Sequence, residues 1–94
     1  MRVTITGHAK FEADRRNIPE ELIRSVVERP QQKLPSKKGR IIIQNKYHDE
    51  FEGKEMLLRI VGLEENEEFN VITVYKTSKI DKYWIKEEQH ESHL

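Results

Sequence analysis

Apolar and polar residues alternate at the beginning of the chain and then change to helical spacing. The alternation in Arg2–Thr6 predicts a short, half-exposed strand, and Gly7 interrupts it. The next segment, His8–Arg16, is rich in helix-forming residues, and we expect Ala9 and Phe11 to face inward. The sequence therefore predicts a strand followed directly by a first helix.

A second helix is predicted over Pro19–Glu28. Proline is tolerated in the first turn of a helix, and Glu20 and Glu21 complement the positive end of the helix dipole. The apolar residues that recur at helical spacing are Ile18, Leu22, Ile23, Val26 and Val27. The following stretch, Pro30–Gly39, contains two prolines and several lysines, which is typical of a loop.

Three later segments are rich in β-branched and aromatic residues: Arg40–Tyr47, Met56–Leu63 and Phe69–Lys76. Short acidic or glycine-containing connectors separate these segments, so we expect three strands in an antiparallel meander. The middle segment is apolar on both faces except at Arg59, which predicts a central strand that is covered on both sides.

A chain of 94 residues is long enough for only one thin hydrophobic core. We therefore expect residues 1–84 to form a single α+β domain, in which two N-terminal helices after a short strand pack on an antiparallel β-meander. Residues 85–94 are charged and have no periodic pattern, so we expect a frayed tail there.

The chain carries 17 basic and 17 acidic residues, but these charges are unevenly placed. The segment from Arg29 to His48, both included, contains six lysines and arginines and no carboxylate, and further lysines follow Tyr75. Such stretches suit an anionic partner such as RNA, although solvated lysine-rich loops have the same composition. The chain has no cysteine, no signal-peptide pattern and no apolar run of about 20 residues, so we expect a cytoplasmic protein without membrane contact.

Arg59 is the most informative single residue, because a cation among apolar neighbours is costly unless it is paired or faces a wet cleft. If paired residue numbers in the last two strands have an even sum, Arg59 and Tyr75 lie on one face. The opposite face then collects Leu58, Ile60, Ile72 and Val74. This register separates polar from apolar residues, and it predicts a shallow site, open to solvent, around Arg59 and Tyr75. The alternative is an arginine that pairs with one of the many glutamates.

Aromatic and basic residues gather where the last strand ends. Lys79 and Lys82 are cations that could bind phosphate, and Tyr83 offers a ring on which an RNA base could stack. The alternative is that Tyr83 and Trp84 anchor the end of the chain to the core. His8 could act as an acid or base near neutral pH, or be purely structural. We expect neither a metal nor a cofactor, because no set of three ligands is evident.

Several runs of the sequence resemble an uncharacterised prokaryotic domain family. They are Ile5-Thr6-Gly7-His8-Ala9, Arg15-Arg16-Asn17-Ile18, Gly39-Arg40, Leu58-Arg59-Ile60, and residues 71–84 with Tyr75-Lys76-Thr77-Ser78-Lys79 and Lys82-Tyr83-Trp84. Asn17 stands where the family often has glycine, a mild departure because asparagine also tolerates a left-handed backbone. Domains of this family are similar in element order to the RelE/ParE-like toxins, in which two helices precede an antiparallel sheet.

The resemblance implies a toxin-like endoribonuclease of a toxin–antitoxin system, which cleaves RNA without a metal by attack of the 2′-hydroxyl on the adjacent phosphate. Arg59, with Arg40 or Lys79, would stabilise the negative charge. Tyr75 or His8 would transfer protons. The residues expected to bind RNA are Lys38, Arg40, Lys82 and Tyr83.

The partners that the resemblance implies are RNA, including mRNA on the ribosome, and a small antitoxin protein. A bare edge strand would also allow a second copy of the chain to pair with the first. The alternative function is a non-catalytic protein- or RNA-binding module on the same scaffold.

Overall fold

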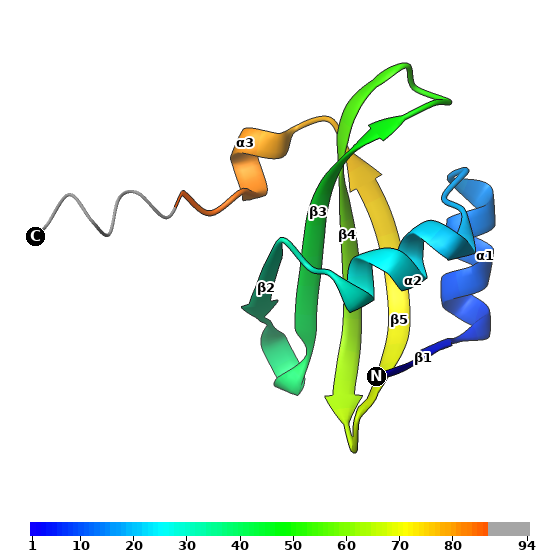
Figure 1. Ribbon diagram of the computed structural model, residues 1–94, viewed down its shortest axis with the longest axis vertical. Coiled ribbons are helices and arrows are strands. Elements are labelled where there is room, and N and C mark those ends of the chain that lie inside the picture. Colours follow the sequence, from blue (N-terminus) through cyan, green and yellow to red (C-terminus); the bar gives the residue numbers. More distant parts are fainter. Residues whose placement is uncertain (87–94) are drawn as a thin grey trace, which may run out of the picture.

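The computed structural model describes residues 1–86, which form one sheet and its covering helices (Figure 1). The frayed tail that we predicted lies outside the described residues from residue 87 onward. In chain order the elements are β1 (Arg2–Ile5), α1 (Gly7–Arg15), α2 (Glu20–Glu28), β2 (Gln32–Pro35), the 3-10 turn η1 (Lys37–Gly39), β3 (Ile41–Asp49), β4 (Lys54–Glu65), β5 (Glu68–Thr77) and α3 (Ile80–Tyr83).

The five strands lie in the order β1-β5-β4-β3-β2. Strands β2 to β5 are antiparallel neighbours, but β1 pairs with β5 in parallel, so the sheet is mixed. A helix rather than a hairpin follows β1, which leaves the strand free to pair in either direction. The prediction of an α+β domain is confirmed, whereas a purely antiparallel sheet is wrong.

Strand β2 replaces the loop that we predicted over Pro30–Gly39. Its residues pair with β3, with Gln32 opposite Gln44 and Leu34 opposite Ile42. Prolines are compatible with this strand because β2 lies at the edge of the sheet. The outer side of an edge strand has no neighbour, so no hydrogen bond between strands is lost where a proline lacks its N–H on that side.

The side chain of Thr6 begins α1 by accepting a hydrogen bond from the Ala9 N–H at 3.1 Å. Ala9 and Ala13 are buried against the sheet, but Phe11 is 61% exposed, so its predicted inward position is wrong. The reason is geometric, because buried residues four apart define one face and Phe11 lies between them on the opposite one. After the helix, Asn17 adopts a left-handed backbone with φ of 57°, which asparagine tolerates.

The core lies between the helices and one face of the sheet, and α1 and α2 both cover that face (Figure 1). The buried strand residues on this face are Ile43, Leu58, Ile60, Phe69, Val71 and Val74. Strand β4 is central, and all of its residues from Met56 to Ile60 are buried, as predicted. Every second one of these residues faces away from the helices, so a second layer must cover the other side.

The hairpin between β4 and β5 contains a local conflict between sequence and backbone. Both central residues have positive φ, 52° at Asn66 and 61° at Glu67, as in the two-residue type I′ turn. Asparagine suits the first position, but the second favours glycine, because a left-handed backbone costs other residues roughly 1–2 kcal/mol. The hairpin therefore forms in spite of Glu67.

Replacing Glu67 by glycine is expected to raise the free energy of unfolding by about 1 kcal/mol, since the backbone penalty disappears. Denaturant unfolding measures the change. Glu65→Gly is the matched control, because it removes the same side chain from a strand position, where glycine is expected to destabilise by roughly 0.5–1 kcal/mol. An unchanged or lower stability of Glu67→Gly would contradict a strained turn.

Candidate functional site

Four polar residues form a row across the sheet on the face opposite to α1 and α2. Gln32 pairs with Gln44, Gln44 with Arg59, and Arg59 with Tyr75, so one residue from each of four neighbouring strands lies in the row. We call these residues the polar row. The predicted register is confirmed here, because Arg59 and Tyr75 are direct partners on the same face.

The register changes at a bulge between Val61 and Gly62. Val61 pairs with Thr73 and Gly62 with Val71, so Ile72 is an extra residue in β5. The predicted position of Ile72 on the apolar face, paired in the same register, is therefore wrong. The bulge is what allows Phe69 and Val71, as well as Val74, to enter the core.

Side-chain hydrogen bonds connect all members of the polar row. Arg59 donates from Nη1 to the Tyr75 hydroxyl at 2.5 Å and from Nε to Gln44 Oε1 at 2.9 Å. Gln44, which is completely buried, donates from Nε2 to Gln32 Oε1 at 2.7 Å. The row is thus one continuous network, which fixes the orientation of the Arg59 guanidinium.

The segment Lys79–Ile85, which we call the cover, lies over the polar row. The ring of Tyr83 stacks on Arg59, with the guanidinium carbon 4.2 Å from the ring centroid. Gln44 donates to the Tyr83 carbonyl at 3.1 Å, and Gln32 exchanges two hydrogen bonds with the backbone of Ile85. The interpretation that the aromatic residues anchor the end of the chain is therefore confirmed for Tyr83.

The cover changes the predicted character of the site. Arg59 is only 8% exposed, so the expectation of a shallow site open to solvent is wrong for this conformation. Within residues 1–86 no carboxylate lies within ion-pair distance of Arg59, so the predicted alternative of a glutamate partner is not found in that range. A desolvated cation with neutral hydrogen-bond partners retains its attraction for an anion.

The structure brings only some of the other predicted residues to the polar row. Lys79 and Lys82 lie in the cover, and Lys82 Nζ is 5.3 Å from the Tyr83 ring centroid. His8 lies exposed in the first turn of α1, on the opposite face of the sheet from Arg59. Lys38 and Arg40 flank the start of β3, so they lie at the other end of that strand from the cover.

Sequence reasoning missed Gln32 and Gln44. Gln32 lies in the stretch that the prolines and lysines predict to be a loop, and Gln44 lies in a predicted strand with no role expected for it. One signal for Gln44 was available, because it is the polar exception in the run Ile41-Ile42-Ile43-Gln44, just as Arg59 is in its own strand. Two polar exceptions in neighbouring central strands favour a shared buried network.

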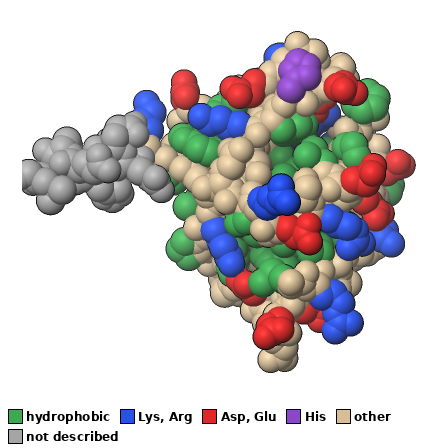
Figure 2. Space-filling model, viewed as in Figure 1, with side chains coloured by type: hydrophobic (Ala, Val, Ile, Leu, Met, Phe, Trp, Pro, Cys, Tyr) green, Lys and Arg blue, Asp and Glu red, His purple; other side chains and the backbone are tan. Residues whose placement is uncertain are grey.

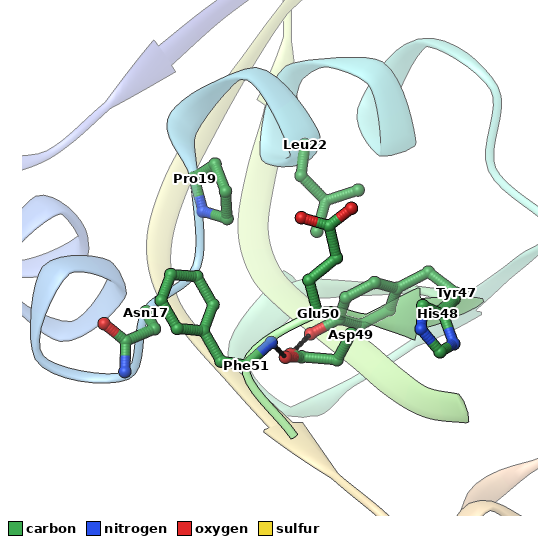
Figure 3. Close-up of a pocket in the computed structure, with 8 residues that line it drawn as sticks. All are labelled: Asn17, Pro19, Leu22, Tyr47, His48, Asp49, Glu50 and Phe51. Carbon is green, nitrogen blue, oxygen red and sulfur yellow. Dashed lines mark hydrogen bonds between the residues drawn. The ribbon is translucent and has the colours of Figure 1, made fainter. Parts of the chain in front are cut away.

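A second cluster lies on the helix-covered face, around the buried Asp49 (Figure 3). Its carboxylate accepts hydrogen bonds from the Tyr47 hydroxyl at 2.6 Å, from Lys76 Nζ at 2.7 Å and from two backbone N–H groups. Burial raises the pKa of Asp49, but the hydrogen bonds from Lys76, Tyr47 and the Glu52 backbone outweigh it and lower the pKa to about 2. Burial and the Asp49 carboxylate also raise the pKa of the Tyr47 phenol.

A hollow of about 210 Å³ adjoins this cluster, between the start of α2 and the β3–β4 hairpin (Figure 3). Pro19 and Leu22 line one side of it, and Tyr47 and Phe51 line the other. All polar atoms of Asp49 point to partners within the protein, so the hollow offers mainly apolar surface. It lies on the other face of the sheet from the polar row.

Among residues 1–86, no three histidine, aspartate or glutamate side chains lie close enough together to hold a metal ion. No helix in that range has the length and apolar character needed to cross a membrane.

The fold and the polar row define an α+β domain with a mixed five-stranded sheet and a buried arginine centre. Comparison of the chain with family models, with curated proteins and with solved structures finds no match.

Proposed function

We propose that this domain is a toxin-like endoribonuclease, and that the polar row is its catalytic centre. The observation that carries the proposal is Arg59, a buried guanidinium whose partners among residues 1–86 are all neutral. A buried cation costs stability unless an anion compensates it, so its retention points to a use for the charge. The similarity of the element order to RelE/ParE-like toxins supports the same function.

The proposed chemistry is attack of a ribose 2′-hydroxyl on the adjacent phosphate, which forms a 2′,3′-cyclic phosphate while the bond from phosphorus to the 5′-oxygen of the next nucleotide breaks. The 2′-hydroxyl loses a proton, the leaving 5′-oxygen gains one, and negative charge builds up on the phosphate oxygens in the transition state. Arg59 would stabilise that charge with the N–H groups not used by Gln44 and Tyr75. Tyr75 would transfer a proton, because its hydroxyl lies 2.5 Å from Arg59 Nη1 and thus close to a phosphate bound there. Lys79 would add positive charge from the cover.

Access to Arg59 requires movement of the cover, because Tyr83 stacks on the guanidinium. The helix within the cover has four residues, and none of them is fully buried. Segments with so few buried contacts open locally at a small cost in free energy. The proposal therefore includes local opening of the cover when RNA binds.

The same stacking favours a second candidate function, a non-catalytic binding module. In that case Tyr83 and Arg59 would be a structural pair, and RNA or a protein would bind elsewhere on the surface. An antitoxin strand or a second copy of the chain would find the edge of β2 more open than that of β1, where Arg24 Nη1 donates to the Val3 carbonyl at 2.8 Å.

Substitution of Arg59 by methionine separates the two candidate functions. If the row is catalytic, we expect cleavage to fall by roughly 10²–10³-fold in Arg59→Met, because a preorganised donor is lost. Stability is expected to change little, because removal of the buried charge is offset by the loss of the hydrogen bond to Gln44 Oε1 and of the stacking on Tyr83. A site retained for chemistry, and not for folding, has this combination of effects.

The measurement is induction of each protein in cells, with transcript ends mapped, together with thermal unfolding of the purified proteins. Tyr75→Phe tests the proton transfer, and Arg29→Met, an exposed arginine outside the row, is the control for loss of charge. New RNA ends that appear equally with wild type and Arg59→Met would remove Arg59 from the mechanism. No new ends with any protein, including Tyr83→Ser with its weakened cover, would favour the binding module.

A further inference from the structure

Two hollows meet at the end of the sheet where β5 finishes. The first, of about 300 Å³, is lined by Arg15, Arg16, Lys54 and Lys76, together with Asn17 and Ser78. The second, of about 560 Å³, is lined by Lys46, Lys79 and Lys82, and again by Ser78. Ser78 is exposed and directly follows the last residue of β5, so it stands between the two hollows.

The hollows belong to opposite faces of the sheet. Lys76, in the first, pairs with Leu58 of the core face and lies on the same side as α1. Lys46, in the second, lies two residues from Gln44 on β3 and therefore on the face of the polar row. A ligand that occupies both hollows must cross the end of the sheet over Ser78.

Positive charge is concentrated at this end of the sheet. Seven of the 17 cations of the chain line the two hollows, but only three of its 17 carboxylates do, namely Glu52, Glu55 and Asp81. Figure 2 shows acidic and basic side chains interspersed over much of the face in view. Two further carboxylates, which line neither hollow, pair with three of these cations. Seven cations against five carboxylates leave an excess of two positive charges at the sheet end, in a chain whose net charge is zero.

Contacts within the protein hold several of these cations in place. Arg15 and Arg16 both pair with Glu12, Lys76 pairs with Asp49, and Lys46 Nζ lies 4.2 Å from the centroid of the Trp84 ring. Lys54 and Lys79 have no ion pair among residues 1–86, which leaves their charge available. The surface thus combines positioned cations with free ones.

From this arrangement we infer that a single strand of RNA crosses the end of the sheet at Ser78, with backbone phosphates in both hollows. The inference rests on the proposed function in taking RNA as the ligand. A chain of phosphates fits better than one small anion, because the cations are spread over both faces. The second hollow continues toward the catalytic centre, since Lys46 and Gln44 are separated by roughly 7 Å along β3.

Charge reversal at Lys54 and at Lys79 tests each hollow separately. The probe is a fluorescent single-stranded RNA of about 12 nucleotides, a typical length for such sites, with every 2′-hydroxyl methylated to prevent cleavage. We expect Lys54→Glu and Lys79→Glu each to weaken binding about tenfold and to lower the salt dependence by about 0.7 per lost phosphate contact. The double variant is expected to combine both losses.

Lys10→Glu and Arg29→Glu are the matched controls, because both side chains are exposed and line neither hollow. The inference is overturned if the hollow variants bind like these controls, if the wild type binds no RNA, or if an acidic peptide of equal charge binds more tightly. Cleavage is scored separately on unmethylated RNA. If RNA binding depends on Lys54 and Lys79 but no RNA is cleaved, only the proposed catalysis is contradicted. If RNA is cleaved but Lys54→Glu and Lys79→Glu bind it as the wild type does, only the proposed course of the RNA across the two hollows is contradicted.

Discussion

Replacing Asp49 by alanine is expected to lower the free energy of unfolding by about 3–5 kcal/mol, because it leaves the buried Lys76 ammonium without its principal anion. The side chains of Asp49 and Lys76 are only 2% and 7% exposed. The Tyr47 hydroxyl and two backbone N–H groups lose their acceptor in the same step. Glu52, 3.9 Å from Lys76 Nζ, offsets part of the loss, so the lower end of the range is expected.

Chemical denaturation with a double-mutant cycle checks this expectation. Lys76→Met added to Asp49→Ala is expected to restore much of the stability, since no unpaired charge remains buried. Glu50→Ala removes the neighbouring exposed carboxylate and should change stability by less than about 0.5 kcal/mol. Equal stabilities of Asp49→Ala and Glu50→Ala would show that the buried pair contributes nothing to folding.

The same pair gives the protein a defined response to acid. The folded state lowers the pKa of Asp49 from 3.8 to about 2. A carboxyl with a lowered pKa contributes its full stability above pH 3.8 and loses that contribution as the pH falls through about 2. We therefore expect the free energy of unfolding to fall more steeply with decreasing pH in the wild type than in Asp49→Asn. Denaturant unfolding at several pH values between about 5 and about 2 measures this difference.

Substitution of Gly62 by alanine is expected to destabilise the domain by about 1–3 kcal/mol, the usual effect of overpacking a core. A Cβ at this position would lie 2.4 Å from the Asn70 carbonyl oxygen and 2.4 Å from the Phe69 ring. Phe69 is completely buried and the oxygen belongs to the backbone, so neither can withdraw easily. The bulge between β4 and β5 thus depends on the absence of a side chain at Gly62.

Gly7→Ala is the control, because nothing lies within 4 Å of the added Cβ. Gly7 begins α1, where alanine is expected to be neutral or to stabilise by up to about 1 kcal/mol. Denaturant unfolding of both variants, and of Gly62→Ala with Phe69→Leu, measures the effect. If Gly62→Ala unfolds like the wild type, the close approach of the Phe69 ring does not constrain position 62.

The sequence predicts an element correctly where one physical requirement, such as the burial of apolar side chains, outweighs all others. The continuous apolar run of β4 predicted a central, covered strand, and the separation of Arg59 and Tyr75 from Leu58, Ile60 and Val74 predicted the register. Both are confirmed, because misplacing such a strand would expose a whole apolar face. The left-handed backbone at Asn17 also agrees with its residue type.

The failures occur where tertiary contacts override local preference. Strand β2 is held by its partner β3 in spite of Pro30 before it and Pro35 at its end, and α3 is too short for a periodic pattern. The bulge interrupts the period of two that a regular strand predicts, and its signal in the sequence is that Phe69 and Val71 lie at odd positions but Val74 at an even one. The burial of Arg59 could not be predicted, since it depends on a segment that returns to the sheet from beyond its last strand.

The parallel pairing of β1 with β5 sets an order for events on the ribosome. Arg2 pairs with Glu68, so β1 leaves the exit tunnel before its partner and stays unpaired until 66 more residues have been translated. The helices that follow β1 are translated early, but their apolar side chains, such as Ile23 and Val27, are not fully buried until β5 completes the core. Long-range closure of this kind slows folding. The nascent chain is therefore expected to expose apolar surface until β5 emerges. During this interval a chaperone or a cotranslational partner would be able to bind that surface.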